Sequence, residues 1–280
     1  MIARLQAGEE HSVSRSVAFY KVMEKLWPLG ISAKSIVRLP LVDKHLGPRI
    51  VNERNTDCTW IPVAEDIEVP PESVMPRQLL FELVDRASLC FIADRFICRS
   101  SAGCSNFPVE IGCLVLGEGV RDINPWMGKP ASKEEAKAHV TLAMKHGLLP
   151  LVLHASFDAF LFGIKDYRRM LVVCFCCECC CTVRLNMRGG PVSYRNQIRR
   201  LPGLSMVAGG DCSGCGECAR TCFLGAIELG DTGPEFSDFC KCCGRCAGLC
   251  PSGNIRVECD PAVDTRGDLF RRLGARTSID

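Results

Sequence analysis

The chain has 280 residues, of which 47% are hydrophobic and 24% charged, so it can form one large or two modest globular domains with real cores. A formal net charge of +2 argues against a strongly basic nucleic-acid-binding protein. The outlier is the cysteine count of 21, yet a disulfide-rich secreted scaffold would be shorter and would follow a signal peptide. The first ten residues contain no apolar segment of the kind that a signal peptide has, and no run of about 18 apolar residues, which could span a membrane, occurs in the chain. We therefore expect a cytoplasmic protein without a membrane span, whose thiols are reduced or bound to metal.

The N-terminal part is predicted to begin with helices and short buried strands. Apolar residues recur at helical spacing over residues 11–27 and again over Pro76–Ser88. Between them, residues 28–75 are rich in proline and turn residues, which predicts a loosely structured cap with a short strand at Trp60–Val63. The apolar segment Leu89–Ile92 predicts a buried strand.

A first group of cysteines follows that strand. It consists of Cys98, Cys104 and Cys113. Their spacings match no standard zinc or iron–sulfur signature. Three thiols on a loop-rich stretch can hold three corners of a metal cluster, or a zinc ion; three buried structural cysteines are the alternative interpretation.

The middle of the chain predicts a helix followed by two strands. A capping-box pattern that starts at Ser132 begins a helix that continues to about His146. His139 and His146 lie seven residues apart, whereas paired metal ligands on a helix are more often four apart, so both are predicted to be surface or interface histidines. Leu149–Leu153 and Leu171–Val173 predict buried strands, which together with the helices favour an α+β fold class, with a mixed α/β N-terminal domain.

The second of these strands runs directly into six cysteines within eight residues. Such a density exceeds any packing need, because free thiols oxidise easily. If the run stays extended, alternate side chains face opposite ways. One side would then carry Cys174, Cys176 and Cys180, and the other Cys177, Cys179 and Cys181. One side could complete a metal site begun by the first cysteine group, and the other could serve a second metal, a redox disulfide or a partner.

The chain is predicted to divide into four parts. Residues 1–181 form the cysteine-rich domain, 182–210 a basic linker, 211–260 a metal-binding domain, and 261–280 a polar tail with a short helix at 269–273. The linker holds five arginines and no acidic residue. These are Arg184, Arg188, Arg195, Arg199 and Arg200. They either belong to a solvated connector or face anionic metal clusters or an acidic redox partner.

Residues 211–260 contain two cysteine runs with the spacing C-x2-C-x2-C-x3-C, which indicates two [4Fe–4S] clusters. Three closely spaced thiolates bind three iron corners, and the fourth thiolate comes from the other run. The predicted ligands of cluster I are Cys212, Cys215, Cys218 and Cys250, and those of cluster II are Cys240, Cys243, Cys246 and Cys222. Paired C-x2-C motifs also occur in zinc ribbons, but there the two pairs stand well apart.

On these motifs, residues 205–260 resemble bacterial-type two-cluster [4Fe–4S] ferredoxins. Pro251 follows the last cysteine as in that family, whereas Phe223 follows Cys222 where a proline is usual. Cys242 lies inside the second run but outside its spacing and is expected to be unligated. Over about residues 60–260 the chain also resembles poorly characterised ferredoxin-fused proteins with a "CICR…C…GC" segment and a C-x-CC-x-CCC run. That resemblance implies iron–sulfur binding and electron transfer, and no known reaction.

We therefore expect an iron–sulfur protein that relays single electrons between redox partner proteins through two [4Fe–4S] clusters, with a further site for zinc or a third cluster in the N-terminal domain. Two alternatives stay open: a redox enzyme subunit whose N-terminal cysteines are the reactive centre, and a thiol-based metal or redox sensor. The chain has no G-x-G-x-x-G fingerprint, P-loop or C-x3-C-x2-C radical motif, which counts against an enzyme and leaves catalytic residues unknown. Exposed clusters are labile to oxygen, so an anaerobic host is expected.

Overall fold

A computed structural model of the chain describes residues 15–32, 39, 41, 44, 45, 52, 55–63, 76–95, 97–187 and 192–280. The helix predicted over residues 11–27 and the cap predicted over residues 28–75 lie partly outside the described residues, as does Arg188 of the predicted linker. Within the described ranges, none of the helices combines the length and the apolar character that crossing a membrane requires.

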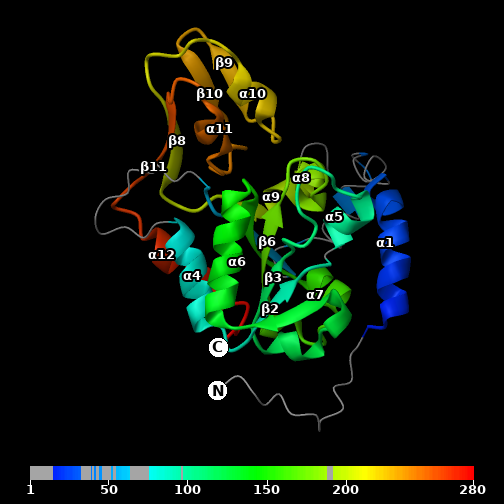
Figure 1. Ribbon diagram of the computed structural model, residues 1–280. Helices are drawn as coiled ribbons and strands as arrows, with labels where there is room; N and C mark the ends of the chain where they lie inside the picture. The colour runs from blue at the N-terminus through cyan, green and yellow to red at the C-terminus, as the bar shows by residue number, and fades with distance from the viewer. Residues whose placement is uncertain are drawn as a thin grey trace.

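The larger part of the molecule is built on a mixed sheet of seven strands (Figure 1). The strands are β1 (Thr56–Trp60), β2 (Cys90–Ala93), β3 (Leu114–Leu116), β4 (Gly128–Ala131), β5 (Leu149–Ala155), β6 (Leu171–Cys176) and β7 (Ile198–Arg199). Their order is β4-β2-β3-β6-β5-β1-β7, and every neighbouring pair is antiparallel except β1 with β7. The three strands predicted from apolar segments at 89–92, 149–153 and 171–173 are present, whereas the strand predicted at 60–63 lies earlier, at β1.

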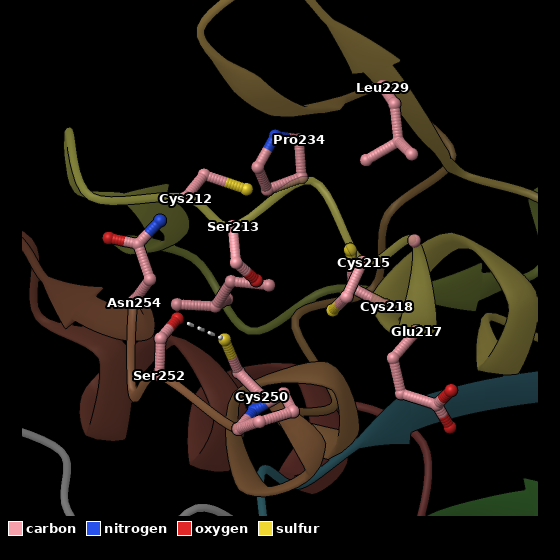
Figure 2. Close-up of a pocket in the computed structure, with 13 residues that line it drawn as sticks. Cys212, Ser213, Cys215, Glu217, Cys218, Leu229, Pro234, Cys250, Ser252 and Asn254 are labelled. Atoms are coloured by element: carbon pink, nitrogen blue, oxygen red, sulfur yellow. Dashed lines mark hydrogen bonds between the residues drawn. The ribbon is translucent and has the colours of Figure 1, made fainter.

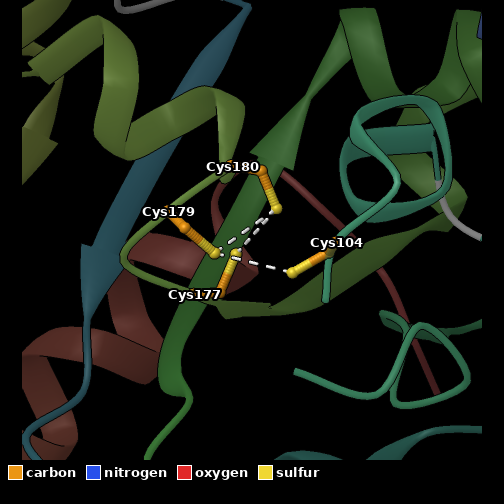
Figure 3. Close-up of side chains that lie close together, drawn as sticks. All are labelled: Cys104, Cys177, Cys179 and Cys180. Atoms are coloured by element: carbon orange, nitrogen blue, oxygen red, sulfur yellow. Dashed lines mark hydrogen bonds between the residues drawn. The ribbon is translucent and has the colours of Figure 1, made fainter. Parts of the chain in front are cut away.

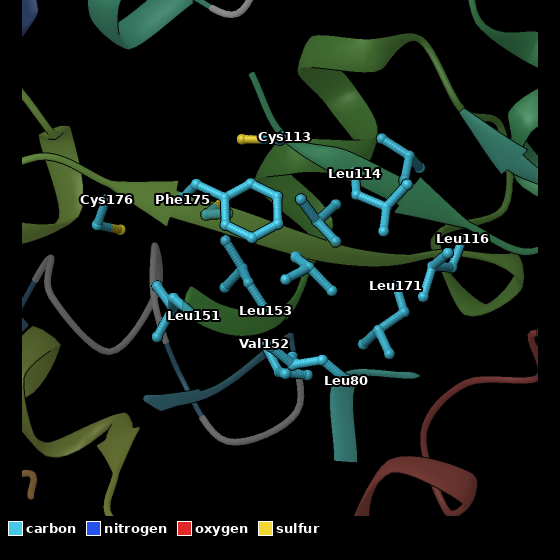
Figure 4. Close-up of a cluster of buried hydrophobic side chains, with 14 of the residues drawn as sticks. Leu80, Cys113, Leu114, Leu116, Leu151, Val152, Leu153, Leu171, Phe175 and Cys176 are labelled. Carbon is cyan, nitrogen blue, oxygen red and sulfur yellow. The ribbon is translucent and has the colours of Figure 1, made fainter. Parts of the chain in front are cut away.

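The centre of this sheet is apolar on both faces, because every residue of β5 and β6 is buried. Figure 4 shows their side chains packed with those of β3 and with Leu80. Leu80 belongs to α4 (Pro76–Arg86), which packs beside α6 (Lys133–Lys145). The fold is therefore the mixed α/β class that the alternation of predicted helices and strands indicated.

Helix α6 begins with the predicted capping box. The Ser132 hydroxyl accepts from the Glu135 backbone N–H at 3.1 Å, and the Glu135 carboxylate accepts from the Ser132 N–H at 2.8 Å. The prediction of a surface or interface position is wrong for His139: its ring is buried within the larger part, with Nε2 at 2.8 Å from the carbonyl oxygen of Gly112. Spacing along the helix could not reveal that this face of α6 meets the loop before β3. His146 is exposed, as predicted.

A second group of helices lies in the larger part, away from α4 and α6. It comprises α1 (Val17–Ser32), α5 (Ile97–Ala102), α7 (Ser156–Phe162), α8 (Thr182–Met187) and α9 (Val192–Asn196). Helix α1 packs against α5 and α8, as Figure 1 shows. It runs past Pro28, where the sequence predicted its end; the proline lies in the last two turns, so it interrupts few backbone hydrogen bonds.

The smaller part of the molecule follows β7 and carries little regular structure (Figure 1). β8 (Leu204–Ala208) pairs antiparallel with β11 (Ile255–Cys259), and β9 (Ile227–Gly230) pairs with β10 (Gly233–Phe236). Two short helices, α10 (Glu217–Thr221) and α11 (Arg245–Leu249), each follow a cysteine loop. Because α8, α9, β7 and β8 all fall within residues 182–210, the predicted linker contributes elements to both parts.

The last helix, α12 (Thr265–Gly274), contains the short helix predicted at residues 269–273 but is no free tail. Its apolar pair Leu269 and Leu273 is buried, since residues four apart share one helix face. On the same helix, Arg272 pairs with the buried Asp57 of β1. From the polar composition of residues 261–280 we predicted a tail, whereas the structure has a helix that docks on the large sheet.

Candidate metal centres

One pocket in the smaller part is lined by thiols from both cysteine runs (Figure 2). Leu229 and Pro234 also line it. Its thiols belong to Cys212, Cys215, Cys218 and Cys250. Cys250 ends the second run, so the chain brings it back to the first run, as the predicted ligand set of cluster I requires.

The loop that carries three of these thiols winds through residues in the left-handed region. Gly214 and Gly216 have φ of 68° and 72°, which glycine adopts without steric cost. The turn directs the Gly214 N–H to the Cys212 Sγ at 3.5 Å, and Gly216 forms the N-cap of α10. Backbone N–H groups that point at sulfur stabilise a thiolate.

The second loop repeats this conformation residue for residue. Cys242 takes the place of Gly214 with φ of 48°, and its N–H points to the Cys240 Sγ at 3.5 Å. Gly244 takes the place of Gly216, with φ of 75° as the N-cap of α11. The thiol of Cys242 is buried and contacts the carbonyl oxygen of Leu204 at 3.5 Å, so it packs against β8.

Burial raises the pKa of Cys246, and three neighbouring thiols raise it further. These belong to Cys243, Cys240 and Cys222. Hence Cys222, the last cysteine of the first run, lies with the second run. Burial raises the pKa of Cys243 to about 11, whereas the pKa of Cys240 is lowered to about 7, first by a hydrogen bond from Cys242.

A third group of four thiols lies in the larger part (Figure 3). Its members are Cys104, Cys177, Cys179 and Cys180. All four Sγ atoms lie within 4.8 Å of one another, with contacts of 3.3 Å between Cys177 and Cys180 and 3.5 Å between Cys104 and Cys179. A tetrahedral ion with metal–sulfur bonds of about 2.3 Å holds its sulfurs about 3.8 Å apart. The group can therefore hold one metal ion. We call it the surface thiol group, because Cys179 is exposed.

The fold assembles this group at the end of a strand. β6 ends at Cys176 and residues 178–180 form a turn, so the chain does not stay extended. The predicted alternation is therefore wrong: Cys180 joins Cys177 and Cys179, and Cys181 leaves them. Cys104 comes from the end of α5, where Gly103 turns the chain with φ of 57°.

The five other predicted N-terminal candidates form a separate set, which we call the buried thiol group. Its members are the half-buried Cys98 and the buried Cys113, Cys174, Cys176 and Cys181. The pairing of Leu114 with Val173 places Cys113 directly beside Cys174. Cys181 precedes α8, and the Cys98 Sγ lies 3.2 Å from Thr182 Oγ1. The nine candidate thiols are thus divided between two places.

The smaller part docks on the larger one through residues that lie next to cysteines of both parts. The ring of Phe223 packs edge-on against the fully buried Trp60, with 5.2 Å between centroids. The Arg184 guanidinium lies 4.0 Å from the same ring centroid. The Val63 N–H donates to the Cys243 carbonyl at 3.2 Å, and Arg245 pairs with Glu178. Phe223 thus contributes to the docking of the two parts. In the sequence, the only indication of this was that a phenylalanine stands where a proline is usual.

No protein family model, curated protein or solved structure matches the chain.

Proposed function

We propose that this chain is an iron–sulfur electron-transfer protein, in which a small C-terminal domain of the two-cluster ferredoxin type is docked on a mixed α/β domain. The clusters are two [4Fe–4S] cubanes, and each changes by one electron. Their ligands are Cys212, Cys215, Cys218 and Cys250 for cluster I, and Cys240, Cys243, Cys246 and Cys222 for cluster II.

The observation that carries the proposal is the repeated loop with exchanged fourth thiols. Both loops place left-handed residues at the same two positions, and the last cysteine of each run lies with the other run. An exchange of the fourth thiolate between two runs is typical of two-cluster ferredoxins, and the arrangement therefore supports the proposal.

The spread of the thiols favours cubanes over zinc. Among the described residues, only the surface thiol group brings its sulfurs within 4.8 Å of one another. The C-terminal thiols are more widely spaced, as is required when each thiolate binds a different iron corner. Zinc ribbons would need two compact sets there.

The two clusters would face different neighbours. Cys215 is exposed beside the open pocket, so cluster I is accessible to a redox partner protein. Cluster II faces the larger part, where Val63 and Glu178 contact its loop. Electrons would pass between the partner and the interior through cluster I and then cluster II.

The surface thiol group would hold a single tetrahedral ion, zinc or iron. Its sulfur separations of 3.3, 3.5 and 3.8 Å lie at or somewhat below the distance of about 3.8 Å between thiolates on one tetrahedral ion, so a small outward movement of two side chains would admit it. Soft thiolate ligands select such metals over magnesium or calcium. The ion would fix the turn at residues 178–180, beside the docked domain.

The test is a count of transferable electrons under anaerobic conditions. Wild-type protein, Cys212→Ser and Cys259→Ser are reduced with dithionite, freed of excess reductant and titrated with ferricyanide. We expect Cys212→Ser to return about one electron per chain fewer than wild type, because one cluster is lost. Cys259→Ser, a matched control in β11 outside both ligand sets, returns the wild-type number. Equal numbers in all three proteins, or no reversible reduction of wild type, would refute the proposal.

A further inference from the structure

Four thiols of the buried thiol group are neighbours, and we call them the ring. The register of β3 and β6 places Cys113 on the sheet face that also carries Cys176. Burial and the thiols of Cys181 and Cys113 raise the pKa of Cys98, and the same two thiols, Cys181 first, raise the pKa of Cys176. Cys174 is a hydrogen-bond neighbour of Cys113 and lies near Cys176, so it lines one side of the ring. The fold therefore brings together thiols from the starts of α5, β3 and α8 and from the end of β6. Figure 4 shows Cys113 and Cys176 at the edge of the apolar core.

Hydrogen-bond donors surround this ring. The Thr182 hydroxyl accepts from Trp27 Nε1 at 2.9 Å, which leaves its own proton free to donate to the Cys98 Sγ at 3.2 Å. Backbone N–H groups of Val183 and Arg184, in the first turn of α8, donate to the Cys181 thiol. A hydrogen bond from Cys176 and these backbone hydrogen bonds favour the thiolate and lower the pKa of Cys181, whereas at Cys98 burial outweighs the hydrogen bond and raises the pKa.

A buried cation next to the ring lacks an anion. Arg184 is 3% exposed, and its Nε and Nη1 have no hydrogen-bond partner within the described part of the chain. It interacts with Cys176 and Cys181. Burying an unpaired guanidinium costs several kcal/mol, so a charge of opposite sign is expected beside it.

A second buried cation lies nearby on α5. Arg99, which follows Cys98, donates from Nη1 to the Phe175 carbonyl at 2.8 Å, and its Nε has no partner among the described residues. Phe175 lies between Cys174 and Cys176. A cubane with four thiolates carries a net charge of about −2 in its oxidised form, which two guanidinium groups would neutralise.

We propose that Cys98, Cys113, Cys176 and Cys181 hold a third [4Fe–4S] cluster inside the larger part, with Arg99 and Arg184 as its counter-charges. A cubane fits better than a single ion because these four sulfurs, unlike those of the surface thiol group, do not all lie within 4.8 Å of one another. The inference extends the proposed relay, and it stands without clusters I and II because none of its ligands belongs to them.

The position of Arg184 also fixes the neighbour of this cluster. Its guanidinium lies over the ring of Phe223 and interacts with Cys243, a ligand of cluster II in our assignment. One cation thus separates the buried thiols from cluster II. The third cluster is therefore the acceptor or donor next in line after cluster II, and the surface thiol group lies to one side of this path.

The test compares two buried cysteines in the full chain. Anaerobically purified wild type, Cys181→Ser and Cys90→Ser are analysed for iron, sulfide, zinc and copper per chain. Wild type is expected to hold about twelve iron and twelve sulfide. Cys181→Ser should lose about four of each, and Cys90→Ser, whose buried thiol belongs to neither N-terminal group, should lose none.

Two results would overturn the inference. One is equal iron and sulfide in wild type and Cys181→Ser; the other is a wild-type content of only eight iron and eight sulfide, which also decides the matter if Cys181→Ser does not fold. A single additional ion without sulfide would show that the ring holds no cubane. Neither result would refute the proposed function, which is tested separately by the number of electrons that Cys212→Ser returns.

Discussion

The C-terminal loops and the N-terminal thiol groups use the same side chain in two different ways. In the loops, three of four thiols lie within seven residues of sequence, and left-handed residues such as Gly214 and Cys242 turn the chain around the site. In the larger part, the thiols come from separate elements, and strand register and a turn decide which of them meet. Local spacing therefore predicts which thiols lie together only where most of them belong to one loop.

The largest expected effect concerns the loops. Cys215→Ser should remove cluster I, a loss of about four iron and four sulfide per chain, because one iron corner loses its thiolate. Cys242→Ser, a matched change within the second loop, should retain all iron, since its thiol contacts the Leu204 carbonyl. Iron and sulfide analysis measures both. Equal iron loss in the two variants would contradict the ligand assignment.

The next largest effect concerns the metal affinity of the surface thiol group, whose thiols come from α5 and from the turn after β6. Cys177→Ser should weaken metal binding at the surface thiol group by more than about 100-fold, because loss of a ligand exceeds the cost of losing a hydrogen bond to one. Competition with a chromogenic chelator measures the affinity. Cys90→Ser, a buried thiol outside both N-terminal groups, is the control and should bind as wild type does. An unchanged affinity in Cys177→Ser would exclude the site.

A third prediction concerns the docking of α12 on the large sheet, which involves no metal-binding thiol. Arg272→Met should destabilise the larger part by about 3 kcal/mol, because Asp57 is 1% exposed and loses its nearest cation. Arg276, with Nε 3.4 Å from the same carboxylate, remains and limits the loss. Chemical denaturation followed by tryptophan fluorescence reports the change. Asp268→Asn, which breaks only an exposed 3.9 Å contact of Arg272, should change stability by less than about 0.5 kcal/mol.

The smallest effect is a pH dependence in the larger part. Burial raises the pKa of Asp158 to about 7, so the folded chain holds a proton that the unfolded chain releases near pH 4. This contribution to stability is complete below pH 4 and is lost as pH rises to about 7. Between pH 6 and pH 8 wild type should lose about 1 kcal/mol from this group, and Asp158→Asn should not. Unfolding at both pH values tests it; an identical pH dependence in the variant would contradict it.

The comparison also shows how far the sequence could predict this molecule. The apolar segments gave β2, β5 and β6, and the capping box gave the start of α6, because these signals are local. His139 was misplaced because its burial depends on the loop that reaches Gly112. The partners of Cys180 and Cys181 were misassigned because a turn replaces the extended chain.

Arg184 shows the same limit most clearly. In the sequence it belongs to a basic segment that reads equally well as a solvated connector. In the structure it is buried over Phe223, between thiols that are far apart along the chain. Of the two interpretations of the basic segment, the solvated connector does not hold at this position, because the arginine is buried beside thiols of both parts.

The most direct test of the central claim is the metal and sulfide content of anaerobically purified wild-type protein. Two cubanes in the C-terminal loops predict at least about eight iron with equal sulfide per chain, and the third cluster raises both to about twelve. Dithionite should then produce the EPR signals of reduced [4Fe–4S] clusters. Zinc in place of iron, with no sulfide, would contradict the account and make the two loops zinc sites.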